Sequence, residues 1–208
     1  MSSWVPYLKD AFFVVGSLAG VLAFLRPVVE SKHQKDTERL GAILSKFPEN
    51  QIMSLDSCVY SSRRIPESVL RPFDEIEHKH GDGWQELKFV GPLKKVLEPE
   101  FKCLVAEYRE FREYVQVPEW EPKDVDGEYD WFFNKQAFRD GHVISDKYAE
   151  HLQQATDAAI QLRKRFQRIQ AVTDLHFFEA LFGRFYAPRL FKSRGLECSN
   201  NALQRTSR

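Results

Sequence analysis

The stretch from Ala11 to Leu25, AFFVVGSLAGVLAFL, constrains this chain most, because its fifteen residues carry no charge. As a helix it would rise roughly 22 Å, which is shorter than the ~30 Å hydrocarbon core of a bilayer. Trp4 and Tyr7 precede it at positions typical of interfacial aromatic residues, and they extend its reach. We therefore expect residues 1–29 to form a retained transmembrane anchor.

Two other interpretations of this stretch stay open. A cleaved signal peptide would need small residues after the apolar region, whereas Phe24, Leu25 and Arg26 are bulky. A buried helix of a soluble protein would carry polar residues along one face, and the stretch offers only Ser17. Both fit less well than an anchor.

The basic residues near the anchor indicate its orientation. Four of them follow it, against Lys9 and the α-amino group on the other side: Arg26, Lys32, Lys35 and Arg39. Because positive flanks stay in the cytoplasm, we expect a single-pass inner-membrane protein whose N-terminus is outside and whose C-terminal domain is cytoplasmic. The three widely spaced cysteines, Cys58, Cys103 and Cys198, fit a reducing compartment.

Small residues form a stripe within the anchor, at Gly16, Ala19, Gly20 and Ala23. Small residues four positions apart let two helix backbones approach closely in lipid. The stripe therefore predicts helix packing at these positions and self-association through the anchor. The alternative is that glycine and alanine are simply common in such helices.

Beyond the anchor, two segments carry heptad seams of apolar residues. The first has Phe101, Leu104, Tyr108, Phe111 and Val115, and the second has Tyr148, Leu152, Ala155, Ala159, Leu162, Phe166 and Ile169. Heptad spacing lets one helix pack along another, and the connection between them is long enough for antiparallel packing. We predict an all-α fold with an N-terminal transmembrane helix and a cytoplasmic helical bundle that contains this antiparallel pair. The bundle would span residues 30–191, followed by a basic, disordered tail over residues 192–208.

The charges are balanced over the whole chain but not locally. Thirty basic residues match thirty acidic ones, yet residues 98–130 hold eleven acids against four bases, and residues 160–208 hold ten bases against three acids. Antiparallel packing would bring the two regions together as exposed ion pairs, with Glu98, Glu100 and Glu107 near Arg163, Lys164, Arg165 and Arg168. Alternatively, the basic C-terminus is attracted to anionic lipid, or indirectly to nucleic acid.

Shorter patterns complete the coarse prediction. Helical spacing is found over residues 31–47 and again at Val69, Leu70, Phe73 and Ile76, where Pro72 should kink or shorten the helix. Residues 51–60 fit a helix or a short strand equally well. Residues 117–141 are rich in acids, proline and glycine, and we expect a solvated connection with a helical turn near residues 131–137. Asp174 could cap a last short helix that Pro188 closes.

The last helix, HFFEALFGRFYAPRLF over residues 176–191, combines aromatic and basic residues. Phenylalanines at helical spacing are most often core residues. A basic, aromatic, amphipathic helix is also attracted to the inner leaflet of a membrane. Contact with the membrane surface is therefore the alternative, through Phe178, Phe182, Arg184, Phe185 and Arg189.

No pattern of catalytic residues is evident. The HKHGD sequence at residues 78–82 holds two histidines but no further ligand cluster, so a solvated turn is the better interpretation. Residues 124–130 resemble part of a calcium loop, but the glycine comes too early and position twelve is Lys135 rather than glutamate. Nucleophile elbows, phosphate-binding glycine loops and HExxH motifs are missing from the sequence. We predict a non-enzyme with no metal and no cofactor.

The order of features resembles a group of small bacterial helical membrane proteins with a single anchor. The resemblance covers residues 10–115 and includes ERLGAILSKFP at residues 38–48 and RRIPESVLRPFDEI at residues 63–76. Some members are membrane effectors of phage-defence, retron-linked cassettes. The resemblance thus implies an effector that damages the bilayer once a protein partner releases it. The alternative function is a passive, membrane-tethered scaffold that recruits cytoplasmic partners.

Overall fold

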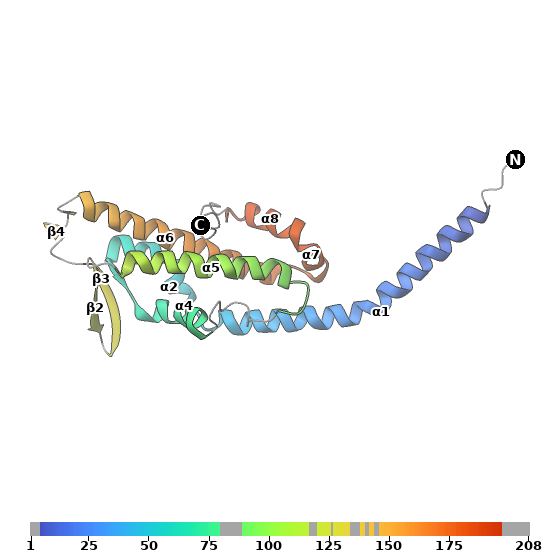
Figure 1. Cartoon of the computed structure of the whole chain (residues 1–208), viewed down its shortest axis with the longest axis horizontal. Coiled ribbons are helices and arrows are strands. Elements are labelled where there is room, and N and C mark those ends of the chain that lie inside the picture. Colours follow the sequence, from blue (N-terminus) through green and yellow to red (C-terminus); the bar gives the residue numbers. More distant parts are fainter. Residues whose placement is uncertain are drawn as a thin grey trace.

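A computed structural model describes residues 5–79, 89–116, 120–125, 127–133, 138–139, 142–143 and 146–196. The helices are α1 (Val5–Leu44), α2 (Glu49–Met53), α3 (Leu55–Ser57), the π-helix η1 (Cys58–Ser62), α4 (Glu67–Lys79), α5 (Lys94–Val115), α6 (Asp146–Ala171), the 3-10 helix η4 (Val172–Asp174), α7 (Phe177–Leu181) and α8 (Gly183–Ser193). The strands are β1 (Arg64–Ile65), β2 (Trp120–Val125), β3 (Glu128–Phe133), β4 (Phe138–Arg139) and β5 (His142–Val143). Figure 1 shows an elongated body from which the first half of α1 projects.

Helix α1 joins the predicted anchor and the helix predicted over residues 31–47 into one element of 40 residues, with Pro27 inside it. Among the described residues, no helix combines the length and the apolarity needed to cross a bilayer. The predicted transmembrane anchor and the single-pass membrane location are therefore wrong. The physical reason is length, because Asp10 and Arg26 bound an uncharged stretch of only fifteen residues.

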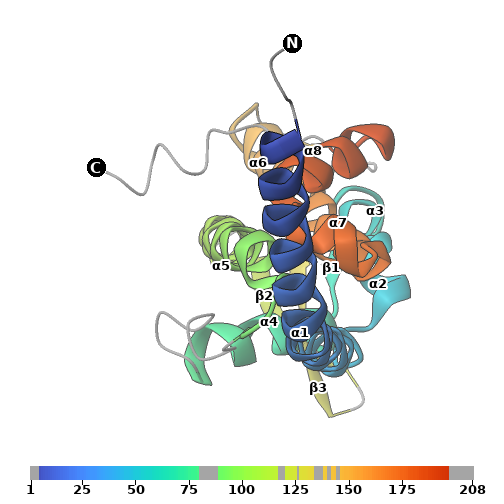
Figure 2. The same cartoon turned by 90° about the vertical axis from the view of Figure 1, so that its right-hand side faces the viewer.

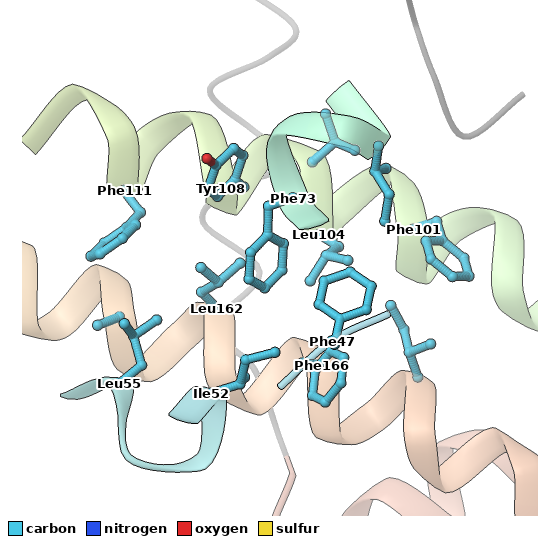
Figure 3. Packing of buried hydrophobic residues seen from close by; sticks show 14 of the residues in the cluster. Phe47, Ile52, Leu55, Phe73, Phe101, Leu104, Tyr108, Phe111, Leu162 and Phe166 are labelled. Carbon is cyan, nitrogen blue, oxygen red and sulfur yellow. The ribbon is translucent and has the colours of Figure 1, made fainter. Parts of the chain in front are cut away.

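Helices α5 and α6 form the centre of the body and run antiparallel, as predicted (Figure 1). All five seam residues of α5 are buried, and so are those of α6 from Leu152 to Ile169. Phe47, Phe73, Tyr108 and Phe166 add a cluster of rings beside Leu104 and Leu162 (Figure 3). Their centroids lie 4.9–5.1 Å apart, within the range of favourable aromatic contacts. The heptad pattern therefore identified the core correctly.

A buried carboxylate and a buried leucine fasten the second half of α1 to the body. The Asp36 carboxylate is 1 % exposed and accepts hydrogen bonds from the backbone N–H groups of Val90 and Gly91, both at 2.8 Å. A Cβ atom at Gly91 would lie 2.6 Å from the Lys32 carbonyl oxygen, so only glycine allows this approach. Further along α1, Leu40 is fully buried. The body thus holds α1 firmly from about Lys32 onward.

The connection predicted over residues 117–141 contains strands, so the all-α prediction is wrong. Strands β2 and β3 form an antiparallel hairpin, and β1 extends it into a sheet of order β1-β3-β2. Gly127 has a φ angle of +87°, which the turn between β2 and β3 requires and glycine allows. The aromatic run of β3 supplies the strand propensity, and Trp120 packs edge-on against Phe133.

The acids that suggested a solvated connection are held by ion pairs of the hairpin. Asp130 binds Arg64 of β1, and Glu128 lies 3.6 Å from Arg71 of α4. These pairs tie the sheet to the neighbouring helix. Acidic residues are poor strand formers, so they masked the hairpin in the sequence.

Several smaller boundaries also differ from the predictions. The ambiguous residues 51–60 are helical, and α4 continues through Pro72. The last helices begin after His176 rather than at Asp174, and Pro188 lies inside α8. Pro188 is the sixth residue of α8, beyond the four N–H groups that lack partners at a helix start, so α8 continues through it at the cost of one backbone hydrogen bond.

A cluster of buried charges lies between α5 and α6. Arg165 is 6 % exposed and binds Glu107 at 2.7 Å and Glu100 at 2.8 Å, and Arg168 binds Glu100 at 2.5 Å. Burial alone would lower the pKa of Arg165, but the hydrogen bonds and charges of the two carboxylates outweigh it and raise the pKa. We call Glu100, Glu107, Arg165 and Arg168 the ion cluster.

The ion cluster corrects one part of the charge prediction. Glu100 and Glu107 do face Arg165 and Arg168, but the pairs of Arg165 are buried and the pair of Arg168 is partly buried. The other predicted members bind elsewhere, because Glu98 pairs with Lys94 and Arg163 pairs with Asp56. Removing one partner of a buried pair leaves an uncompensated charge, so Arg165 matters far more to stability than an exposed pair would.

Replacing Leu162 with alanine should lower the free energy of unfolding by about 2–5 kcal/mol, because the side chain is fully buried in the α5–α6 seam. Leu181→Ala provides the control, since Leu181 is 42 % exposed and should lose much less. Urea denaturation of both variants makes the comparison. Equal losses would contradict the position of Leu162 in the core.

Replacing Arg165 with methionine should lower the free energy of unfolding by about 3–5 kcal/mol, because two buried carboxylates lose their main partner. Arg109→Met is the matched control, because Arg109 is half exposed and pairs with Glu77 at the surface. Its loss should be about 0–1 kcal/mol.

Adding Glu100→Gln and Glu107→Gln to Arg165→Met should recover part of the loss, because the neutral side chains remove the uncompensated charge. A triple variant less stable than Arg165→Met alone would contradict this account of the cluster.

Candidate functional site

Helices α7 and α8 close one end of the body, and short-range contacts fix their position. The backbone N–H of His176 donates to Glu179 at 3.0 Å, which starts α7. Gly183 begins α8 against α5, where an added Cβ atom would lie only 2.3 Å from Val96 Cγ2. The start of α8 therefore lies directly against the Val96 side chain of α5.

The inner face of α8 is packed against the ion cluster. Ala187 and Phe191 are buried, and the Arg168 guanidinium lies over the Phe191 ring at 4.2 Å from its centroid. A cation over an aromatic face is attracted electrostatically, more strongly when both are shielded from water. The buried charges therefore also set the rotation of α8, and hence which side chains point outward.

The outer face of α7 and α8 exposes four large apolar side chains. Leu181 is the last residue of α7, and Phe182 follows it. Phe185 and Tyr186 lie one helical turn later, in α8. Phe182 is 57 % exposed and Phe185 is 70 % exposed. Two basic side chains, Arg189 and Lys192, are exposed on the next two turns. We call the four apolar residues the aromatic patch.

Helix α1 leaves the body at the same end of the molecule as α7 (Figures 1 and 2), and a second apolar surface lies there. Where α1 leaves the body, Phe24, Leu25 and Val28 are exposed, and Phe24 reaches 78 %. A ring contact between His33 of α1 and Phe177 of α7, at 5.8 Å between centroids, joins the two surfaces through the body. Apolar side chains exposed in groups mark interaction sites more often than those that occur singly.

The predicted interaction residues divide into three groups. Phe182, Phe185 and Arg189 share the exposed outer face of α8 and its junction with α7. Phe178 and Arg184 belong to α7 and α8, but their side chains lie outside the described part. The same holds for the side chains of Gly16, Ala19, Gly20 and Ala23, whose backbone belongs to the projecting half of α1.

The core interpretation of the C-terminal phenylalanines is right for Phe191 and wrong for Phe182 and Phe185. The predicted membrane-contact residues did not include Leu181 and Tyr186, which belong to the same surface. Their spacing from Phe182 and Phe185, one residue before and one after, was the signal that could have included them. The break between α7 and α8 obscured this spacing, because the residues of two separate helices do not follow one helical periodicity.

The calcium-like loop and the HKHGD sequence do not form a metal site in the described part of the chain. Asp124 accepts a hydrogen bond from Gly127 N–H at 2.9 Å within the hairpin turn, and Asp126 lies outside the described residues. His80 and Asp82 of the HKHGD sequence also lie outside them. Across the described part of the chain, histidine, cysteine and acidic side chains do not gather in groups of three that could hold a metal ion.

Two open hollows of about 480 and 410 Å³ flank the ion pair of Asp174 and Arg194. The larger is lined by α1, α2, α6, η4 and the residues after α8, the smaller mainly by α7 and α8, and both are continuous with solvent. Enclosed, mainly apolar walls with a few polar groups are typical of small-molecule sites, and these hollows lack that enclosure. The exposed apolar end of the molecule is therefore the better candidate for function, as an interaction surface.

Neither the protein-family models, nor the curated protein sequences, nor the solved structures contain a match to this chain.

Proposed function

We propose that this chain is a non-enzymatic helical scaffold that self-associates through the projecting half of α1. The observation that carries the proposal is the extension of α1 beyond the body (Figure 1). This extension contains the uncharged stretch from Ala11 to Leu25. At its base, Phe24, Leu25 and Val28 are exposed rather than packed against the body.

A helix that is apolar on every side is unstable when water surrounds it. Each Å² of apolar surface removed from water contributes about 25 cal/mol, so covering such a stretch is strongly favourable. Helices that are apolar all round are therefore normally covered by other helices or by lipid. A second copy of the same stretch is the simplest cover, because it matches the first in length and in apolar character.

The stripe of small residues supports close packing between two such helices. Gly16 and Gly20 are four residues apart, with Ala19 and Ala23 beside them. Without large side chains between them, two backbones can approach closely and gain many dispersion contacts. The α5–α6 body would then be carried at the end of a helical stalk, where it is free to bind other proteins.

The predicted effector function, in which a partner holds a bilayer-damaging protein in check, stays a prediction. It depended on an anchor that crosses the membrane, which the described helices do not supply. A scaffold needs only association between helices and a stable body. The geometry of α1 therefore supports the scaffold better.

Gly16→Ile combined with Gly20→Ile should shift the full chain from an oligomer toward a monomer, because the larger side chains hold the two backbones apart. Sedimentation velocity at several protein concentrations measures the mass. Gly41→Ile is the matched control on the same helix, since a Cβ atom there meets nothing within 4 Å.

The control should keep the mass of the wild type. Two outcomes would refute the proposal: a wild-type chain that stays monomeric at every concentration, or a double variant with an unchanged mass.

A further inference from the structure

We propose that the aromatic patch and the basic residues beside it bind the surface of an anionic lipid bilayer without crossing it. The patch consists of Leu181, Phe182, Phe185 and Tyr186, and the basic residues are Arg189 and Lys192. This surface differs from the stalk of α1 that the proposed function uses, and different residues carry the inference.

The apolar part of the surface has the geometry of an interfacial contact. Phe182, Phe185 and Tyr186 are 57 %, 70 % and 41 % exposed, and they follow one another along a single outer face. The opposite face of α8 is fixed to the body through Gly183, Ala187 and Phe191. The rings are therefore displayed by a rigid support, and they can enter the head-group region without any rearrangement of the fold.

The charges of the surface favour an anionic partner. Helix α8, GRFYAPRLFKS, contains three basic residues and no acid. Two of the bases, Arg189 and Lys192, are exposed. Of two acids in the neighbouring described segments, Asp174 pairs with Arg194, whereas Glu179 accepts a hydrogen bond from the His176 backbone and keeps its negative charge. Basic residues beside apolar rings are the combination that binds anionic membrane surfaces.

The same charges disfavour a second copy of the patch as its cover. A twofold contact brings the same patch of both copies into one interface, so it would gather the Arg189 and Lys192 charges of both copies with no acid of α8 to pair with them. Like charges placed together in an interface cost binding free energy. In a bilayer that contains anionic lipid, the acyl chains can cover the exposed rings while the head groups pair with Arg189 and Lys192.

Co-sedimentation of the full chain with lipid vesicles tests the proposal. The chain should sediment with vesicles of phosphatidylcholine mixed with phosphatidylserine, and much less with phosphatidylcholine alone. Phe182→Ser combined with Phe185→Ser should weaken binding by at least about tenfold, since two exposed rings no longer enter the lipid. Tyr129→Ser is the matched control, because Tyr129 is a 61 % exposed aromatic residue on the distant β3.

The basic residues are tested separately. Arg189→Gln combined with Lys192→Gln should weaken binding to the mixed vesicles roughly 25-fold, because each basic residue near an anionic surface contributes about fivefold. Lys35→Gln combined with Lys95→Gln removes the same charge from exposed positions on α1 and α5 and should change little. Binding by the wild type should also fall as salt is raised.

Each outcome decides the proposal. Unchanged far-UV circular dichroism and melting temperature would establish that the variants are folded. Equal vesicle binding by the wild type and the Phe182 and Phe185 variant would overturn the proposal, and so would a wild type that ignores anionic vesicles. A drop in oligomer mass for that variant without vesicles would assign the patch to a second copy instead, and would also overturn it.

Discussion

The salt bridges of Arg165 with Glu100 and Glu107 are the interactions on which the rest of the body depends. They sit in the seam between α5 and α6, where each partner is less than 10 % exposed. Pairing of buried charges is demanding, because each ion has lost its water and only correct geometry replaces it. The cluster therefore selects one register of the two helices, while the surrounding apolar residues supply most of the favourable free energy.

Two further contacts fix the positions of α8 and α1 at the end of the molecule. Arg168 belongs to the cluster and also lies over Phe191, so the same charges orient α8. Asp36 holds the second half of α1 to the backbone at Val90 and Gly91. As a result, the aromatic patch lies on a well-packed part of the body. Helix α1 is packed against the body around Asp36, and its first half projects from it. The packing of α8 and α1 thus determines which apolar side chains are exposed at this end of the molecule.

Heptad spacing identified the buried faces of α5 and α6, and the long connection between them predicted their antiparallel orientation. Burial of the ion cluster was not predictable, since a basic residue in a charged helix looks the same in a sequence whether it faces water or a carboxylate. The hairpin was missed because acids and prolines hid the aromatic strand of β3, and its acids are held by Arg64 and Arg71 from distant segments. In the candidate site, Phe182 and Phe185 were found by type, but their exposure depends on how Gly183 fits against Val96.

The central claim is that the projecting half of α1 meets the same segment of another copy. Disulfide cross-linking tests it most directly, in a full chain whose Cys58, Cys103 and Cys198 are replaced by serine. With Ala19→Cys added on the stalk, mild oxidation should produce a cross-linked dimer, because a disulfide needs Cα atoms within about 7 Å. Gln153→Cys, at an exposed position of α6, should stay monomeric under the same oxidation. Equal cross-linking at the two positions, or none at Ala19→Cys, would contradict the claim.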